Sequence, residues 1–178
     1  MSLTGVDRLL AERDIRDCLT RYCRGIDRMD RELLESVYWP DAYDDHDVWK
    51  GPAREFIPWV LEALGNFDQT IHMLGQTLIE FSSPDQAKVE TYLYNYLRQK
   101  AGPDSAKDVL NCGRYLDVVE RRGGQWRIAH RRLIVDWIRD FGVSPRWGEP
   151  IVDGVWKMGG RKPDDLSYIL NAFAPLPS

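Results

Sequence analysis

The chain has 178 residues and a formal net charge of −4, with a pI near 5.4. Nucleic acid and anionic membranes are therefore not expected as its main partners. The sequence has no apolar run of about 18 residues, so no membrane-spanning helix is expected. The first residues show no basic segment followed by an apolar core, and we expect a cytoplasmic protein without a signal peptide.

The cysteine and aromatic content narrows the class further. The three cysteines show neither a CxxC pair nor the spacing of zinc ligands, which favours free thiols in a reducing compartment and no metal site. Seven Trp and eight Tyr are typical of a domain that lines a cavity with rings or buries a large subunit interface. The length suits one main domain over residues 1–140.

The first predicted element is a helix over residues 7–24. Its apolar side is formed by Leu9, Ile15, Cys18, Leu19, Tyr22 and Ile26. Gly25 predicts the end of this helix. Asp27 then follows on the apolar side, where a carboxylate must be paired or have a raised pKa. Asp27 is therefore either a functional carboxylate or a capping or solvated residue.

Two shorter helices are expected next. Asp30 is the candidate N-cap of a helix over residues 31–39, and Pro40 ends it. Residues 42–49 form a short strand or an extended loop in which three aspartates surround His46. That pattern matches no known metal-ligand spacing, so His46 is kept as a candidate pocket residue and not as a metal ligand. A third helix starts at Gly51 and Pro52.

From residue 69 onward, apolar residues recur at every second position and no longer at the spacings of three and four that are typical of a helix. Strands are predicted over residues 69–81, 87–99, 108–121 and 125–139. Helices on one side of an antiparallel sheet make an α+β layer architecture, and a strongly bent sheet leaves a cone-shaped pocket beneath them. Because both faces of the strand over residues 87–99 carry bulky side chains, the second face is expected to pack against another subunit in a dimer or trimer.

Two polar residues stand out on these strands. His72 lies in an apolar run, where a histidine is either a general base facing a closed space or a structural residue with a satisfied hydrogen bond. Strict alternation puts Arg131 on one face of the last strand with Arg127, Ala129, Leu133 and Val135. Such an arginine either reaches solvent along its stem or holds an electronegative group of a ligand. Residues 141–178, rich in Pro and Gly, predict an irregular arm over the pocket mouth or a neighbouring subunit.

Several short motifs together resemble the SnoaL-like branch of the nuclear-transport-factor-2-like superfamily, with its cystatin-like cone fold. The resemblance covers roughly residues 5 to 140 and is carried by LTRYCRGID at 19–27, YWPDA at 38–42, KGP at 50–52, TIH at 70–72, ERRGGQW at 120–126 and HR at 130–131. The most similar group contains γ-hexachlorocyclohexane dehydrochlorinase, bile-acid 7α-dehydratase and scytalone dehydratase. The resemblance implies a lyase without a metal or an organic cofactor, acting on a hydrophobic cyclic small molecule.

The resemblance also implies roles for particular residues. The catalytic Asp–His dyad of these enzymes matches Asp27 and His72, and the arginine that helps the leaving group depart matches Arg131. A tyrosine of the bile-acid dehydratase matches Tyr22.

Scytalone dehydratase uses additional tyrosines and a second histidine, for which His46 and Tyr43 are the candidates here. Alternatives remain open: a non-catalytic binding or association domain, a β subunit like that of ring-hydroxylating dioxygenases, or an isomerase of the ketosteroid kind.

Overall fold

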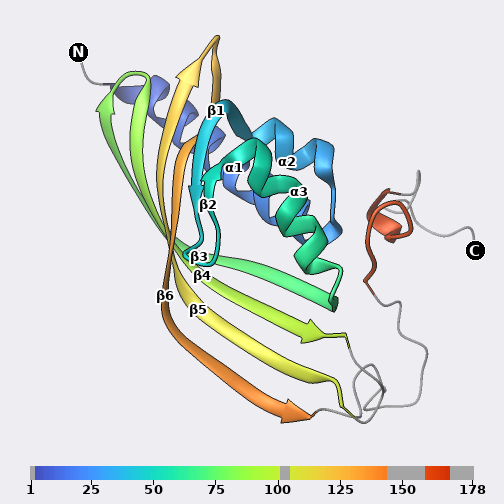
Figure 1. Ribbon diagram of the computed structural model, residues 1–178. Helices are drawn as coiled ribbons and strands as arrows, with labels where there is room; N and C mark the ends of the chain where they lie inside the picture. The colour runs from blue at the N-terminus through green and yellow to red at the C-terminus, as the bar shows by residue number, and fades with distance from the viewer. Residues whose placement is uncertain (1–2, 101–104, 144–158, 169–178) are drawn as a thin grey trace, which may run out of the picture.

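The computed structural model describes residues 3–100, 105–143 and 159–168 (Figure 1). The described helices are α1 (Gly5–Arg28), α2 (Arg31–Val37), α3 (Ala53–Leu64) and the short 3-10 helix η1 (Leu166–Tyr168). The described strands are β1 (Tyr38–Asp45), β2 (Lys50–Pro52), β3 (Phe67–Ser83), β4 (Gln86–Gln99), β5 (Lys107–Arg122) and β6 (Gln125–Val143). Most of the predicted C-terminal arm, residues 144–158 and 169–178, lies outside the described residues.

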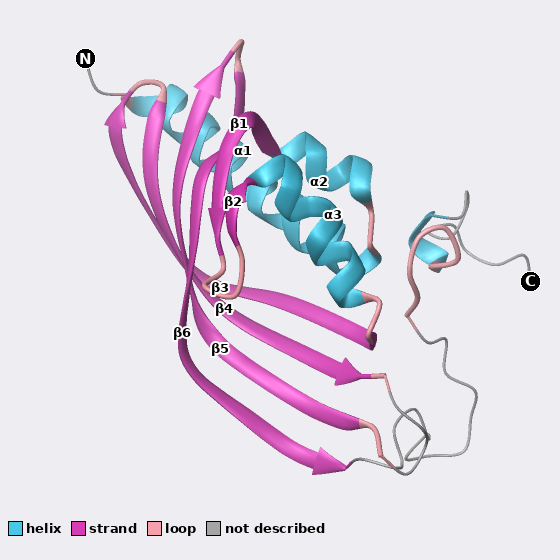
Figure 2. Ribbon diagram, viewed as in Figure 1, coloured by secondary structure: helices cyan, strands magenta, loops and turns pink. Residues whose placement is uncertain are grey.

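All six strands belong to one curved sheet with the order β2-β1-β6-β5-β4-β3. Every neighbouring pair is antiparallel except β1 and β6, which run parallel. The three helices lie together on one side of the sheet, which bends around them (Figure 2). The predicted α+β architecture, with three helices on a strongly curved and mostly antiparallel sheet, is confirmed.

The first helix is longer than the sequence predicts. It continues through Gly25 to Arg28, and Met29 ends it with a left-handed backbone (φ 53°). Gly25 has a packing role, because a Cβ at this position would lie 2.8 Å from the side chain of Leu34. The prediction that this glycine ends the helix is therefore wrong, and Asp27 lies inside the last helical turn.

The last strand departs from strict alternation. Ile128 pairs with Val119 and His130 pairs with Val118, so β6 has one extra residue at this point, a β-bulge. Ile128 and Arg131, three residues apart, are consequently both fully buried. On the N-terminal side of this bulge, the prediction of which residues share a face with Arg131 is wrong. One inserted residue reverses which side chains point inward.

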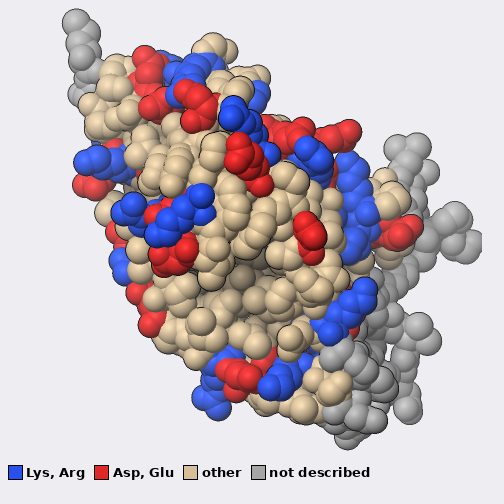
Figure 3. All heavy atoms as spheres, in the orientation of Figure 1, with Lys and Arg blue, Asp and Glu red and all other residues tan. Residues whose placement is uncertain are grey.

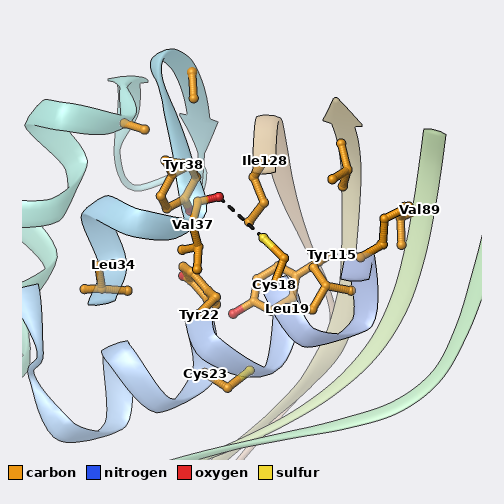
Figure 4. Packing of buried hydrophobic residues seen from close by; sticks show 14 of the residues in the cluster. Cys18, Leu19, Tyr22, Cys23, Leu34, Val37, Tyr38, Val89, Tyr115 and Ile128 are labelled. Carbon is orange, nitrogen blue, oxygen red and sulfur yellow. Dashed lines mark hydrogen bonds between the residues drawn. The ribbon is translucent and has the colours of Figure 1, made fainter. Parts of the chain in front are cut away.

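The core lies between α1 and the inner face of the sheet. Tyr22 of α1 makes edge contacts with the rings of Tyr38 and Tyr115, at centroid distances of 5.9 and 5.7 Å. The Cys18 thiol donates to the carbonyl of Val37 at 3.5 Å (Figure 4). Aromatic and thiol groups thus fix α1 against β1 and β5, and this packing sets the position of the last turn of α1.

The outer face of the sheet exposes large apolar side chains in the described part of the chain, next to the ion pairs of Arg114 with Glu90 and Asp136. The large side chains there are Ile71, Met73, Tyr92, Tyr94 and Trp137. The prediction that a second subunit covers this face stays a prediction. Among the described helices, none combines the length and the apolar character needed to cross a membrane.

Candidate active site

Asp27 and His72 form a hydrogen-bonded pair between the last turn of α1 and strand β3. The distance from Asp27 Oδ1 to His72 Nδ1 is 2.7 Å. The same carboxylate accepts the backbone N–H of His72 at Oδ2 (2.8 Å) and the Thr70 hydroxyl at Oδ1 (3.1 Å). Because both carboxylate oxygens are engaged, Nδ1 of His72 carries the shared proton and Nε2 is the nitrogen left for a ligand.

A carboxylate in the last turn of a helix lies at the negative end of the helix dipole, which disfavours its charge. Arg161, from the described part of the C-terminal arm, offsets this. Its Nη1 donates to the backbone carbonyl of Asp27 at 2.6 Å and to the Thr70 hydroxyl oxygen at 2.9 Å. Burial lowers the pKa of Arg161, although the Asp27 charge opposes that shift. No sequence pattern predicts this contact, because Arg161 lies in an irregular segment rich in Gly and Pro.

A cavity of about 260 Å³ opens beside His72, between α3 and strands β3 to β6. Its lining is mostly apolar and includes Ile26, Trp59, Val60, Leu64, Leu93 and Leu133. The space-filling view shows a recess on this side of the molecule within a mainly uncharged surface (Figure 3). The volume is just below the usual range for small-molecule pockets, roughly 300–1,000 Å³, so the cavity suits a small and largely apolar ring compound.

Two of the predicted binding residues line this cavity together with His72. Tyr22 contributes from α1 and His46 from the loop that follows β1. Burial raises the pKa of Tyr22, so its hydroxyl stays protonated and can donate a hydrogen bond.

Two asparagines in the cavity were not predicted. Asn95 pairs with His72 across β3 and β4, and Asn111 pairs with Asn95 across β4 and β5. The side-chain carbonyl oxygens of both asparagines are buried and have no hydrogen-bond partner in the described part of the chain. The signal was available, because Asn95 interrupts an apolar alternation between Leu93 and Leu97. Both amides can therefore bind polar groups of a ligand next to His72.

Arg131 is not among the residues that line the cavity. Its Nε and Nη2 donate to the two carboxylate oxygens of Asp117 at 2.8 and 2.7 Å, and both side chains are fully buried. The guanidinium lies between the rings of Tyr22 and Tyr115, 4.0 and 3.9 Å from their centroids. Burial alone would lower the pKa of Arg131, but the adjacent Asp117 carboxylate outweighs it and raises that pKa.

The structure places Tyr43 away from the cavity as well. Tyr43 is 42% exposed, and its ring stacks on His130 of β6 with centroids 5.7 Å apart. Of the six predicted site residues, four therefore meet at or beside the cavity: Asp27, His72, Tyr22 and His46.

Comparison with known proteins agrees with this architecture. Residues 7–132 match the model of the SnoaL-like domain family. Because the match spans most of the chain, the protein belongs to this family. An uncharacterised protein of Mycobacterium tuberculosis is 28% identical over 134 residues, which cover 73% of this chain and 88% of that protein.

Two solved structures show the same fold. A type 3 hexachlorocyclohexane dehydrochlorinase from Novosphingobium barchaimii has a TM-score of 0.68 at 21% identity, covering 78% of this chain and 94% of that one. A protein from Novosphingobium aromaticivorans, assigned as a scytalone dehydratase, has a TM-score of 0.67 at 25% identity. The match covers 78% of this chain and 92% of that one. The fold class of this chain thus includes proteins named for elimination reactions.

Proposed function

We propose that this protein is a lyase that needs no cofactor and eliminates water or halide from a small hydrophobic ring compound. The observation that carries the proposal is the Asp27–His72 pair, held at 2.7 Å beside a mostly apolar cavity that His72 lines. A neutral imidazole whose second nitrogen is fixed by a carboxylate is suited to accept a proton from carbon.

In the proposed reaction, Nε2 of His72 takes a proton from a carbon next to a carbonyl group. Asp27 stabilises the imidazolium that forms. Tyr22 supplies a neutral hydroxyl that can donate to the carbonyl oxygen as negative charge develops there. The electrons of the C–H bond then form the double bond as the leaving group departs from the neighbouring carbon.

An isomerase with an aspartate base is the second candidate, and the contacts of Asp27 disfavour it. Such a base needs a carboxylate oxygen directed at the substrate. Here one oxygen accepts from the imidazole of His72 and from Thr70, and the other accepts the backbone N–H of His72. His72 is therefore the better candidate for the base.

Ligand-induced thermal stabilisation against hydroxylated, halogenated and keto ring compounds would find candidate substrates, since a ligand that binds only the folded state raises its melting temperature. Compounds that bind would then be assayed for elimination with the wild type, His72→Ala and His130→Ala. His130 stacks on Tyr43 outside the cavity and is the matched control. We expect His72→Ala to lose at least about 100-fold in kcat/KM while His130→Ala keeps its activity. Equal activity of both variants would refute the proposal.

A further inference from the structure

A second histidine–carboxylate pair faces the same cavity. His46 Nδ1 is hydrogen-bonded to Asp44 Oδ1, and the Tyr38 hydroxyl donates to Asp44 Oδ2 at 2.6 Å. Asp44 is fully buried, so its carboxylate depends on these two partners. This arrangement repeats that of Asp27 and His72, in which a buried carboxylate engages Nδ1 and leaves Nε2 of the ring for other contacts.

The ring of His46 is held on several sides. Its backbone N–H donates to the carbonyl of Trp49 at 2.9 Å, which closes the loop between β1 and β2. The imidazole stacks on Phe56 of α3 with centroids 4.6 Å apart and lies 6.1 Å from the ring of Tyr115. The side chain is 13% exposed and contributes to the cavity lining. His46 is thus fixed in orientation, as a group that transfers a proton must be.

The two histidines come from opposite edges of the sheet. His46 follows β1, which has only β2 beyond it, and His72 lies on β3 at the other edge. The charged and titratable groups around His46 include Asp44, Tyr115 and, further inside, the Asp117–Arg131 ion pair. A substrate in the cavity between His46 and His72 would therefore meet two separate proton-transfer groups, each with its own carboxylate.

We propose that His46 is a general acid that protonates the leaving oxygen, so the substrates are ring compounds with a hydroxyl group on the carbon β to a carbonyl. The inference rests on the proposed function and assigns its leaving group. Hydroxide leaves poorly unless it is protonated, whereas chloride departs as a stable anion and needs no acid. A site built only to expel halide would have no use for a second proton-transfer histidine.

The proposed step balances in atoms and charge. Nε2 of neutral His72 takes the proton from the α-carbon, and the C–H electrons form the C=C bond. The C–O bond breaks as Nε2–H of protonated His46 gives its proton to the departing oxygen, which leaves as water. His72 ends protonated and His46 neutral, so one proton passing from His72 to His46 through solvent restores the starting state. Asp44 and Tyr38 act as positioning residues in this step.

The test compares two leaving groups on one carbon skeleton. Wild type and His46→Gln would be assayed with matched ring ketones that carry hydroxyl or chloride on the β-carbon. A ketone without a leaving group, incubated in D₂O, would report proton abstraction alone through deuterium uptake. We expect His46→Gln to lose roughly 10²- to 10⁴-fold in kcat/KM for the hydroxyl compound. Its losses in chloride elimination and deuterium uptake should be at least about tenfold smaller.

Equal losses on the hydroxyl and chloride compounds would overturn the inference, and so would a wild-type protein that expels chloride but not hydroxide. Thermal unfolding of His46→Gln checks its fold; if that variant unfolds, Asp44→Asn is expected to give the same ratio between the two compounds. Failure of the proposed function has a different signature, because His72→Ala would then retain deuterium uptake. The two failures are therefore distinguishable.

Discussion

Replacing Asp27 with asparagine keeps the size of the side chain but turns one hydrogen-bond acceptor into a donor. If the amide nitrogen took the place of Oδ2, it would face the backbone N–H of His72, which can only donate. If it took the place of Oδ1, it would face the Thr70 hydroxyl, which can rotate, and Nδ1 of His72, which can lose its proton. We expect the second orientation, with the imidazole proton moved to Nε2.

The magnitudes follow from these contacts. A hydrogen bond to a charged group contributes about 1.5–3 kcal/mol and a neutral one about 0.5–1.5 kcal/mol, so Asp27→Asn should lower the free energy of unfolding by about 1–2 kcal/mol. In a protein of this size that shifts the melting temperature by roughly 2–8 °C. Because Nε2 of His72 would then carry a proton and could not accept another, activity should fall roughly 10³- to 10⁴-fold.

Nitrogen NMR of the imidazoles can check the tautomer without a substrate. The chain has three histidines, so ¹⁵N-labelled wild type, His46→Gln and His130→Ala are enough to assign the His72 signals. Asp17→Asn is a matched control on the same helix, because Asp17 is exposed and pairs with Arg21 at the surface, where the loss in free energy of unfolding should be under about 1 kcal/mol. A His72 that keeps its proton on Nδ1 in Asp27→Asn would refute the reasoning.

Three further changes probe the framework of the site. Gly25→Ala places a methyl group 2.8 Å from Leu34, so urea titration should show a loss of about 1–3 kcal/mol, and an unchanged midpoint would contradict the close packing. Arg131→Met leaves the buried Asp117 unpaired, so urea titration should show a free energy of unfolding lower by about 3–5 kcal/mol. A decrease below about 1 kcal/mol would argue against a buried, paired Asp117. Burial raises the pKa of Cys23 to about 12, so iodoacetamide at about pH 8.5 should modify this thiol only in urea. Because of the same raised pKa, the free energy of unfolding should fall as pH rises above about 9, where the thiol of the unfolded chain ionises. Alkylation of Cys23 in the folded protein would refute its burial.

The periodicity of apolar residues along the sequence predicts most of the fold. The apolar stripe through Ile15 and Ile26 predicts α1, although its first predicted member, Leu9, is 66% exposed. The change to alternation at residue 69 predicts the sheet, because each period reflects which side chains a helix or a strand buries. The pairing of Asp27 with His72 is different. Nothing local links two residues 45 positions apart, and it was the resemblance to a family that suggested their contact.

The features that the sequence did not reveal all depend on tertiary contacts. The bulge in β6 is a single extra residue that the composition of the strand does not predict. Because of this residue, Arg131 is buried beside Asp117 and does not lie at the cavity wall. The parallel pairing of β1 with β6 joins Tyr38 to Ile128, a contact that no local pattern encodes. Arg161 reaches the end of α1 from 134 residues away.

The parallel pairing of β1 and β6 also fixes when the site can be assembled during protein synthesis. Asp44 pairs with Arg131 across these strands, so β1 has only the three-residue β2 beside it until β6 has left the ribosome. The helices emerge first, but the wall that holds His46 forms only after residue 131 is available. Contacts between residues so distant in sequence form slowly, and the nascent chain should expose its apolar inner surface until then. We therefore expect a chain that stops before β6 to engage chaperones and to bind no ligand.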